Sequence, residues 1–202
     1  MLSGTVFSLV LLLSLLIPQT ALSQSDKSVE VQIKTSTKFY DFRAYRFRDV
    51  LRQMLLAAPA AGAFGRKVWA QAQRKYDIKL EYSQTGGKCS IRNAIIAMEI
   101  TYILPRLENE NEISSEFKQK WAHVYRILRH HELAHGRNYA QLAERLKIEL
   151  AKLGPHDDCK LVKNAVDELD SRLHHQDLEI NRRFEFDQRK RFKRIQRLIE
   201  QS

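Results

Sequence analysis

The sequence predicts an α+β fold in which a small N-terminal antiparallel sheet, with a short helix, packs against two long helices. In the first half of the chain, apolar residues alternate with polar ones at the two-residue period of half-buried strands. In the second half they recur every three or four residues, which is the period of one face of an α-helix. We expect residues 24–202 to form a single domain, because that length supports one apolar core.

Five segments of the first half have the composition of strands: 29–33, 39–42, 67–73, 77–82 and 89–104. The segment 89–104 is ambiguous at its start and favours a strand toward its end. We expect Pro105 to stop this strand, because proline cannot donate a hydrogen bond to a neighbouring strand. Between the strands, apolar residues at helical spacing predict a short amphipathic helix over 47–56, and small residues predict a loop over 57–65.

The two long helices have clear start and stop signals. Ser114 or Ser115 can cap the first helix, and the sequence Gly154-Pro155 is a normal signal for its end. Asp157 or Asp158 can cap the second helix, which could continue to the end of the chain.

The first long helix carries an HExxH motif at residues 131–135. The apolar stripe of this helix continues through positions 131 and 135, so His131 and His135 are expected to face inward, one turn apart. This is the geometry that two zinc ligands need, and Glu132 could hold a metal-bound water and accept its proton. The alternative to a zinc site is a pair of surface or core histidines without a metal. The inward phase favours the zinc site, and Gly136 is expected to leave open space beside the second histidine.

A catalytic zinc normally has three protein ligands, and the third must come from further along the chain. The longer HExxHxxGxxH pattern is absent, since Asn138 and Gln141 occupy its last two fixed positions. Glu168 is the preferred candidate, because it should face inward from the second long helix, although it could also be a solvated carboxylate. The alternative third ligands are His174, His175 and Asp187. The candidate donors to an oxyanion are Tyr139, His123 and Tyr125.

Residues 1–23 are predicted to be a secretory signal peptide. The uncharged apolar run 6–17 is short for a membrane span and is broken by Pro18. Small residues at Ala21 and Ser23 predict cleavage before Gln24, so we expect a periplasmic or secreted protein. The N-terminal segment lacks lysine and arginine before the run, which leaves an uncleaved anchor as the alternative.

The two cysteines, Cys89 and Cys159, are expected to form a disulfide, because distant cysteines of exported proteins usually pair. Free thiols or a cysteine ligand to the metal are the alternatives.

The chain has a formal net charge of +10, and many of its cations lie in 182–197, within a basic C-terminal helix expected over about 180–202. This run is either a solvated helix face or a contact surface for an anionic envelope component or acidic partner. Nucleic acid is not expected as a partner, because the chain has no recognisable nucleic-acid motif. The oligomeric state is not indicated.

Several short segments occur together in a particular order. They are the signal peptide, Tyr40-Asp41, Leu51-Arg52, Trp69, Cys89, Ile103-Leu104-Pro105-Arg106, Trp121 with Tyr125, the HExxH motif and Cys159. Together they resemble the bacterial family of predicted secreted zinc-dependent proteases, a domain otherwise of unknown function. The resemblance implies a zincin-like α+β domain that acts on a peptide or protein substrate. That family often ends in an Asp followed by Thr-x-His-Gly; here Phe186-Asp187 resembles its start, but Phe192 stands in place of the histidine.

Two classes of function remain open. The first is a zinc-dependent metallopeptidase that hydrolyses peptide bonds with a Zn²⁺-activated water and Glu132 as general base. The second is a non-catalytic periplasmic protein that binds metal or an envelope partner and has a degenerate site.

Overall fold

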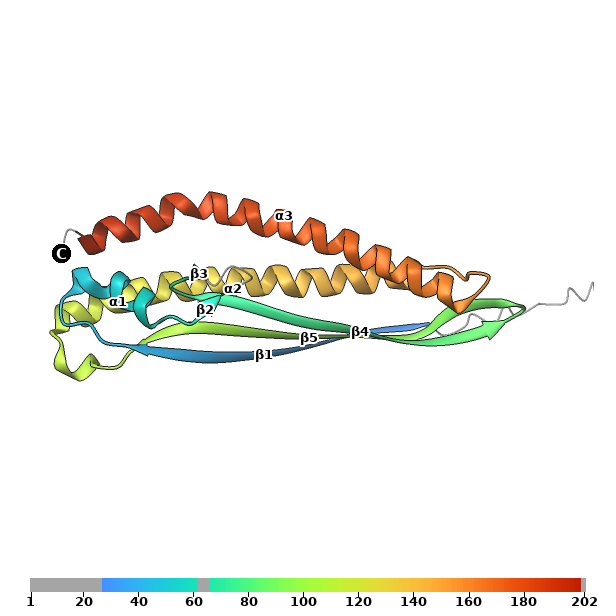
Figure 1. Ribbon diagram of the computed structural model, residues 1–202, viewed down its shortest axis with the longest axis horizontal. Coiled ribbons are helices and arrows are strands. Elements are labelled where there is room, and N and C mark those ends of the chain that lie inside the picture. The colour runs from blue at the N-terminus through green and yellow to red at the C-terminus, as the bar shows by residue number, and fades with distance from the viewer. Residues whose placement is uncertain (1–26, 62–65, 201–202) are drawn as a thin grey trace, which may run out of the picture.

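A sheet of three long strands runs along the molecule, and its order is β1-β5-β4 (Figure 1). The computed structural model describes residues 27–61 and 66–200, so the predicted signal peptide and its cleavage site lie outside the described residues. The strands are β1 (Ser28–Phe42), β4 (Gln71–Thr85) and β5 (Lys88–Leu107). A second, small sheet pairs β2 (Ala60–Ala61) with β3 (Arg66–Lys67).

The expectation of an antiparallel sheet is wrong for one of the two strand pairs of the main sheet. β4 and β5 are antiparallel, joined by a turn in which Gly86 and Gly87 both have positive φ, as the two-residue type I′ hairpin turn requires. β1, however, pairs with β5 in parallel. After β1, the chain passes through α1 and stays at the end of the sheet where β1 finishes, so β4 starts at that end (Figure 1). β4 then runs antiparallel to β1, and the hairpin reverses the chain again, so β5 runs in the same direction as β1.

The strands are also longer than the sequence pattern predicted. Two strands are expected from the sequence over 67–73 and 77–82, but the end of the first segment and all of the second belong to one continuous strand, β4, which begins at Gln71. Residues 66–67 belong to the separate strand β3. β5 passes through Pro105 instead of stopping there. The first residue of β4 pairs with Ile103, so within the described part of the chain β5 beyond that point pairs with β1 alone. The missing N–H of Pro105 can then face the unpaired side, where a proline is tolerated.

The helices confirm the local signals. The predicted short helix is the 3₁₀ turn Phe47–Asp49 followed by α1 (Val50–Ala57). After a 3₁₀ turn at Glu110–Glu112, α2 (Ser115–Lys152) begins where the Ser114 side chain accepts a hydrogen bond from the N–H of Phe117 at 3.2 Å. The last helix, α3 (Cys159–Glu200), begins where Asp158 accepts from the N–H of Leu161 at 2.8 Å.

The helices cover one face of the sheet, and the other face is polar. Figure 1 shows α2 between the sheet and α3. Two apolar clusters result: one, with Ile96 and Leu146, lies toward the β4–β5 hairpin, and the other, with Met54 and Trp121, lies at the α1 end. The polar HExxH segment of α2 lies between these clusters, where it is held on both sides by apolar packing. None of the helices within residues 27–61 and 66–200 is long and apolar enough to cross a membrane.

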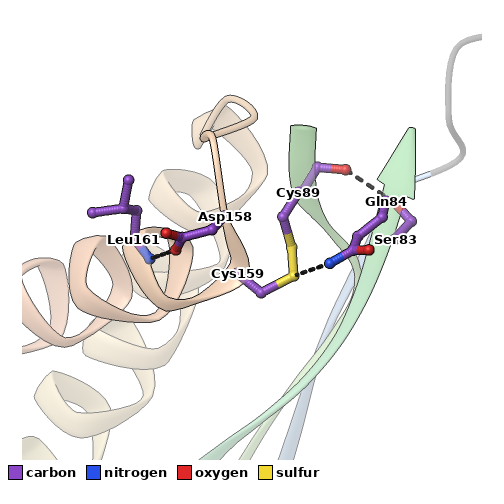
Figure 2. The surroundings of a disulfide bond; sticks show 7 residues. Ser83, Gln84, Cys89, Asp158, Cys159 and Leu161 are labelled. Atoms are coloured by element: carbon purple, nitrogen blue, oxygen red, sulfur yellow. Dashed lines mark hydrogen bonds between the residues drawn. A yellow bond between two sulfur atoms is a disulfide. The ribbon is translucent and has the colours of Figure 1, made fainter. Parts of the chain in front are cut away.

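The predicted disulfide between Cys89 and Cys159 is present and joins the start of β5 to the start of α3 (Figure 2). Next to it, the backbone of His156 exchanges two hydrogen bonds with Cys89, each 2.8 Å long. The connection 153–158 is therefore fastened to the hairpin end of the sheet before α3 begins.

Candidate metal centre

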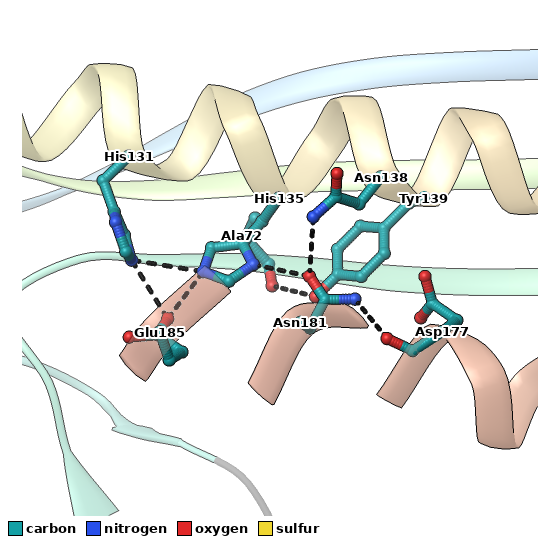
Figure 3. A network of polar contacts seen from close by, with 8 residues as sticks. All are labelled: Ala72, His131, His135, Asn138, Tyr139, Asp177, Asn181 and Glu185. Carbon is teal, nitrogen blue, oxygen red and sulfur yellow. Dashed lines mark hydrogen bonds and ion pairs between the residues drawn. The ribbon is translucent and has the colours of Figure 1, made fainter. Parts of the chain in front are cut away.

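Three side chains from two helices converge on one point. His131 and His135 come from α2, and Glu185 comes from α3 (Figure 3). The two Nε2 atoms are 3.1 Å apart, and Glu185 Oε1 lies 3.0 Å from His131 Nε2 and 2.7 Å from His135 Nε2. The inward phase predicted for both histidines is confirmed, since each of the two residues is less than one-tenth exposed.

These separations match the donor set of a tetrahedral zinc. Zinc binds imidazole nitrogen and carboxylate oxygen at about 2.0–2.2 Å, which places neighbouring ligands about 3.3 Å apart. The three atoms here are closer by about 0.2–0.6 Å, so side-chain shifts of about that size would seat one ion beside their plane. Two histidines and one glutamate are also a ligand set of catalytic zinc, which leaves the fourth position for water.

The electrostatics of the cluster favour a shared cation. Hydrogen bonds from His131 and His135 lower the pKa of Glu185 to about 2, so this carboxylate is ionised. Burial opposes the charged form of His135, but the hydrogen bonds with Glu185 and Asn181 outweigh it and raise the pKa of this imidazole. An ionised oxygen from the half-exposed Glu185 thus meets two buried ring nitrogens, a combination that favours bound protons or a metal ion.

Asn181 orients His135. The side-chain nitrogen of Asn181 donates to the backbone oxygen of Asp177 at 2.9 Å, which assigns the amide orientation. Its oxygen therefore accepts from His135 Nδ1 at 2.8 Å and from the side-chain nitrogen of Asn138 at 3.2 Å (Figure 3). With Nδ1–H held by Asn181, a metal ion could replace the Nε2 proton that His135 shares with Glu185 and bind the Nε2 lone pair. By contrast, Nδ1 of His131 is buried and has no hydrogen-bond partner among the described residues.

Glu132 lines a cleft of about 480 Å³ together with His131, His135 and Glu185. Its side chain is almost completely buried, and this burial raises its pKa, an effect that the nearby His131 and His135 oppose. The cleft is also lined by the backbone segment 68–72, which leads into the unpaired edge of β4. A buried carboxylate with a raised pKa, next to a candidate metal site and open to a cleft, has the properties of a general base.

One of the three candidate oxyanion donors reaches the cleft. Tyr139 lines it, with its hydroxyl donating to the backbone oxygen of Ala72 at 3.4 Å, whereas His123 and Tyr125 are not among the lining residues. The expected open space beside Gly136 is filled, because a β-carbon there would overlap the hydroxyl of Tyr102. Gly136 therefore allows α2 to lie close to β5.

The structure does not bring Glu168 to the histidines, so the preferred third ligand of the sequence analysis is replaced by Glu185. Glu168 lies 17 residues earlier in α3, about 25 Å along the helix axis, and lines a separate hollow with Glu149 and Lys152. The runners-up are also elsewhere. His174 lies 2.9 Å from a guanidinium nitrogen of Arg74, and His175 and Asp187 are exposed and outside the cluster.

The position of α3 along α2 explains this error. A tight turn at Gly154 would place residues 131 and 135 opposite 177 and 173. The contacts instead place them opposite Glu185 and Asn181, eight residues further along α3. The connection 153–158 causes this shift because it runs outward to pair with Cys89 before α3 starts. A sequence signal for Glu185 did exist: Asp177, Asn181 and Glu185 form a polar i, i+4 stripe along α3.

A comparison with known families gives one match. The family model described as "Bacterial protein of unknown function (DUF922)" matches residues 37–192, which include every residue of the candidate metal centre. No curated protein and no solved structure matches the chain. The family description carries no activity.

Proposed function

The chain belongs to the bacterial family DUF922, whose function is unknown, and we propose from its site that the protein is a zinc-dependent metallopeptidase. One observation carries the proposal. His131, His135 and Glu185 present three ligand atoms to one point, and the buried Glu132 lines the same cleft.

The residues of the cleft suit amide hydrolysis. Bound zinc would polarise the scissile carbonyl and lower the pKa of its water toward about 7. Glu132 would accept the proton of that water and deliver it to the leaving amine, a role for which its raised pKa brings it closer to working pH. Tyr139 would supply the hydroxyl that stabilises the oxyanion, because its side chain lines the same cleft.

We further propose that the enzyme works outside the cytoplasm on peptide or protein substrates. The disulfide supports this, because structural disulfides persist in oxidising compartments. The predicted signal peptide points the same way.

The test measures zinc and hydrolysis separately. The purified protein is compared with Glu132→Gln, His131→Ala and the control Glu144→Gln, which removes an exposed charge from the same helix. Zinc is quantified by mass spectrometry, and hydrolysis is followed on a library of internally quenched peptides. We expect Glu132→Gln to keep one zinc and lose turnover by about 10²-fold or more, as expected for loss of a general base. His131→Ala should lose both zinc and turnover.

The outcomes separate the two classes of function. Zinc bound by the unaltered protein, without turnover of any peptide in the library, would overturn the peptidase and support a non-catalytic metal-binding protein. Turnover that Glu132→Gln leaves intact would overturn the assigned role of Glu132. Absence of zinc under metal-replete conditions would overturn the metal centre itself.

A further inference from the structure

An apolar groove lies at the end of the molecule where α1, β3 and the C-terminal part of α3 meet. Its volume is about 650 Å³, which exceeds that of the cleft beside the metal centre. Its apolar wall consists of Leu51, Leu55, Leu56, Trp69 and Ile199. Trp69 also lines the cleft of the metal centre, so the two hollows share one wall. The proposed hydrolysis does not account for this groove.

Among the residues that the structure describes, the charged side chains lining the groove are all cations. They are Arg48 from the 3₁₀ turn before α1, Arg52 from α1 and Lys67 from β3. Lys67 is directed to the end of α1, where its ammonium donates to the backbone oxygen of Leu56 at 2.5 Å. A guanidinium nitrogen of Arg52 lies 3.6 Å from a carboxylate oxygen of Asp49. Arg48 forms no ion pair with any residue that the structure describes. The groove entrance therefore retains a positive charge.

Apolar side chains next to these cations are exposed to solvent. Leu56 is 63% exposed, Leu55 is 37% exposed, and Val68 next to Lys67 is 39% exposed. Further exposed cations follow along α3, among them Arg189 and Lys190. Exposed leucines, an apolar groove and surrounding cations therefore occur together at this end of the molecule.

We propose that this groove docks the protein on an anionic lipid surface. The leucines would enter the boundary between head groups and acyl chains, and Arg48, Arg52 and Lys67 would contact the lipid phosphates. A soluble acidic polymer would satisfy the cations but would leave the exposed leucines in water, so the apolar groove favours a lipid. Docking in this way places the shared wall at Trp69, and with it the cleft of the metal centre, close to the membrane.

Docking through the groove does not depend on the proposed hydrolysis. The experiment is co-sedimentation of the full chain with vesicles of phosphatidylcholine alone or with about 30% phosphatidylglycerol, a content chosen to give an anionic surface. One variant combines Arg48→Gln, Arg52→Gln and Lys67→Gln, and a second combines Leu55→Ser with Leu56→Ser. All proteins share one N-terminus, so differences between them report on the groove.

A matched control removes the same charge elsewhere. It combines Lys34→Gln, Lys75→Gln and Lys79→Gln, which are exposed on the polar face of the sheet. Each cation close to an anionic surface changes affinity about fivefold, so we expect the groove triple variant to bind about 100-fold more weakly to phosphatidylglycerol vesicles. The control should change affinity much less, and the leucine pair should also weaken binding. Thermal melts of each variant, and the single variant Leu56→Ser, exclude loss of folding as the cause.

Any of the following results would overturn the proposal. The first is equal binding to vesicles with and without phosphatidylglycerol. The second is an equal loss of binding in the groove variant and the sheet-face control, which would reduce the effect to net charge. The third is unchanged binding of the leucine variants, or binding that is stronger to soluble polyglutamate than to the anionic vesicles.

Discussion

The hydrogen bond from His135 to Asn181 predicts that zinc affinity depends on a residue that does not touch the metal. The change is Asn181→Ala. Among the described residues, Asn181 Oδ1 is the only oxygen that accepts a hydrogen bond from His135 Nδ1, at 2.8 Å. The change removes this oxygen and leaves the N–H of the buried His135 ring without a partner. The ring can then rotate or shift its proton to Nε2, the nitrogen that faces the cluster.

The size of the effect follows from the role of this hydrogen bond. Removing an outer partner of a metal-bound histidine typically weakens metal binding by about 10- to 100-fold. That range corresponds to about 1.4–2.8 kcal/mol of binding free energy. We expect a value inside this range, since Asn181 is itself anchored to the backbone of Asp177 and no other described side chain replaces it.

The assay is zinc titration of metal-free protein in competition with a chelator of known affinity. Asn138→Ala is the matched control, because Asn138 contacts the same amide oxygen at 3.2 Å but does not contact the histidines. Its zinc affinity should change less than about threefold, given that the hydrogen bond between Asn181 and His135 remains. Asn181→Asp keeps an acceptor for His135 and should bind zinc at least as tightly as the unaltered chain.

The orienting role of Asn181 is refuted if Asn181→Ala binds zinc as tightly as the unaltered chain while both proteins are fully folded. It is also refuted if Asn138→Ala weakens zinc binding as much as Asn181→Ala does. In that case the effect would come from general loosening between α2 and α3, and not from the orientation of the imidazole.

Three further predictions test the ligand set and its support. Glu185→Gln should weaken zinc binding by about 100-fold or more, as for loss of a ligand, whereas Glu168→Gln should bind zinc normally in the same titration. Cys89→Ser opens a loop closed across 70 residues and should lower the free energy of unfolding in urea by about 4 kcal/mol. Gly136→Ala should lower the melting temperature, because overpacking at about 1–3 kcal/mol exceeds the gain in helix propensity, and Tyr102→Phe should restore part of it.

The long helices could be predicted because their determinants are local. The Ser114 cap, the end of α2 before Gly154-Pro155 and the Asp158 cap each depend on a few neighbouring residues. The inward phase of the two histidines follows from the same three- and four-residue spacing. The half of the candidate site that lies on α2, namely His131, Glu132 and His135, could therefore be predicted from the sequence without knowledge of the fold.

The parallel pairing of β1 with β5 could not be predicted in this way. It joins residues more than 60 positions apart, and strand alternation contains no information about the direction of the partner. The extension of β5 through Pro105 has the same origin, because it depends on where β4 begins relative to Ile103. Both errors concern contacts that are distant in the chain.

The third ligand depends on packing at both ends of α3. Near its start the helix is fastened to the sheet through Cys159, and near its other end Ile195 is buried in the cluster around Met54 and Trp121. A rigid helix held at two points has a fixed advance of about 1.5 Å per residue between them, so these anchors decide which residue faces the histidines. Glu185 occupies that position, and a shift of one helical turn would bring Asn181 there instead. The disulfide at the start of α3 and the apolar cluster at its end, which reaches the His131 ring through Phe192, therefore fix which residue of α3 faces the histidines.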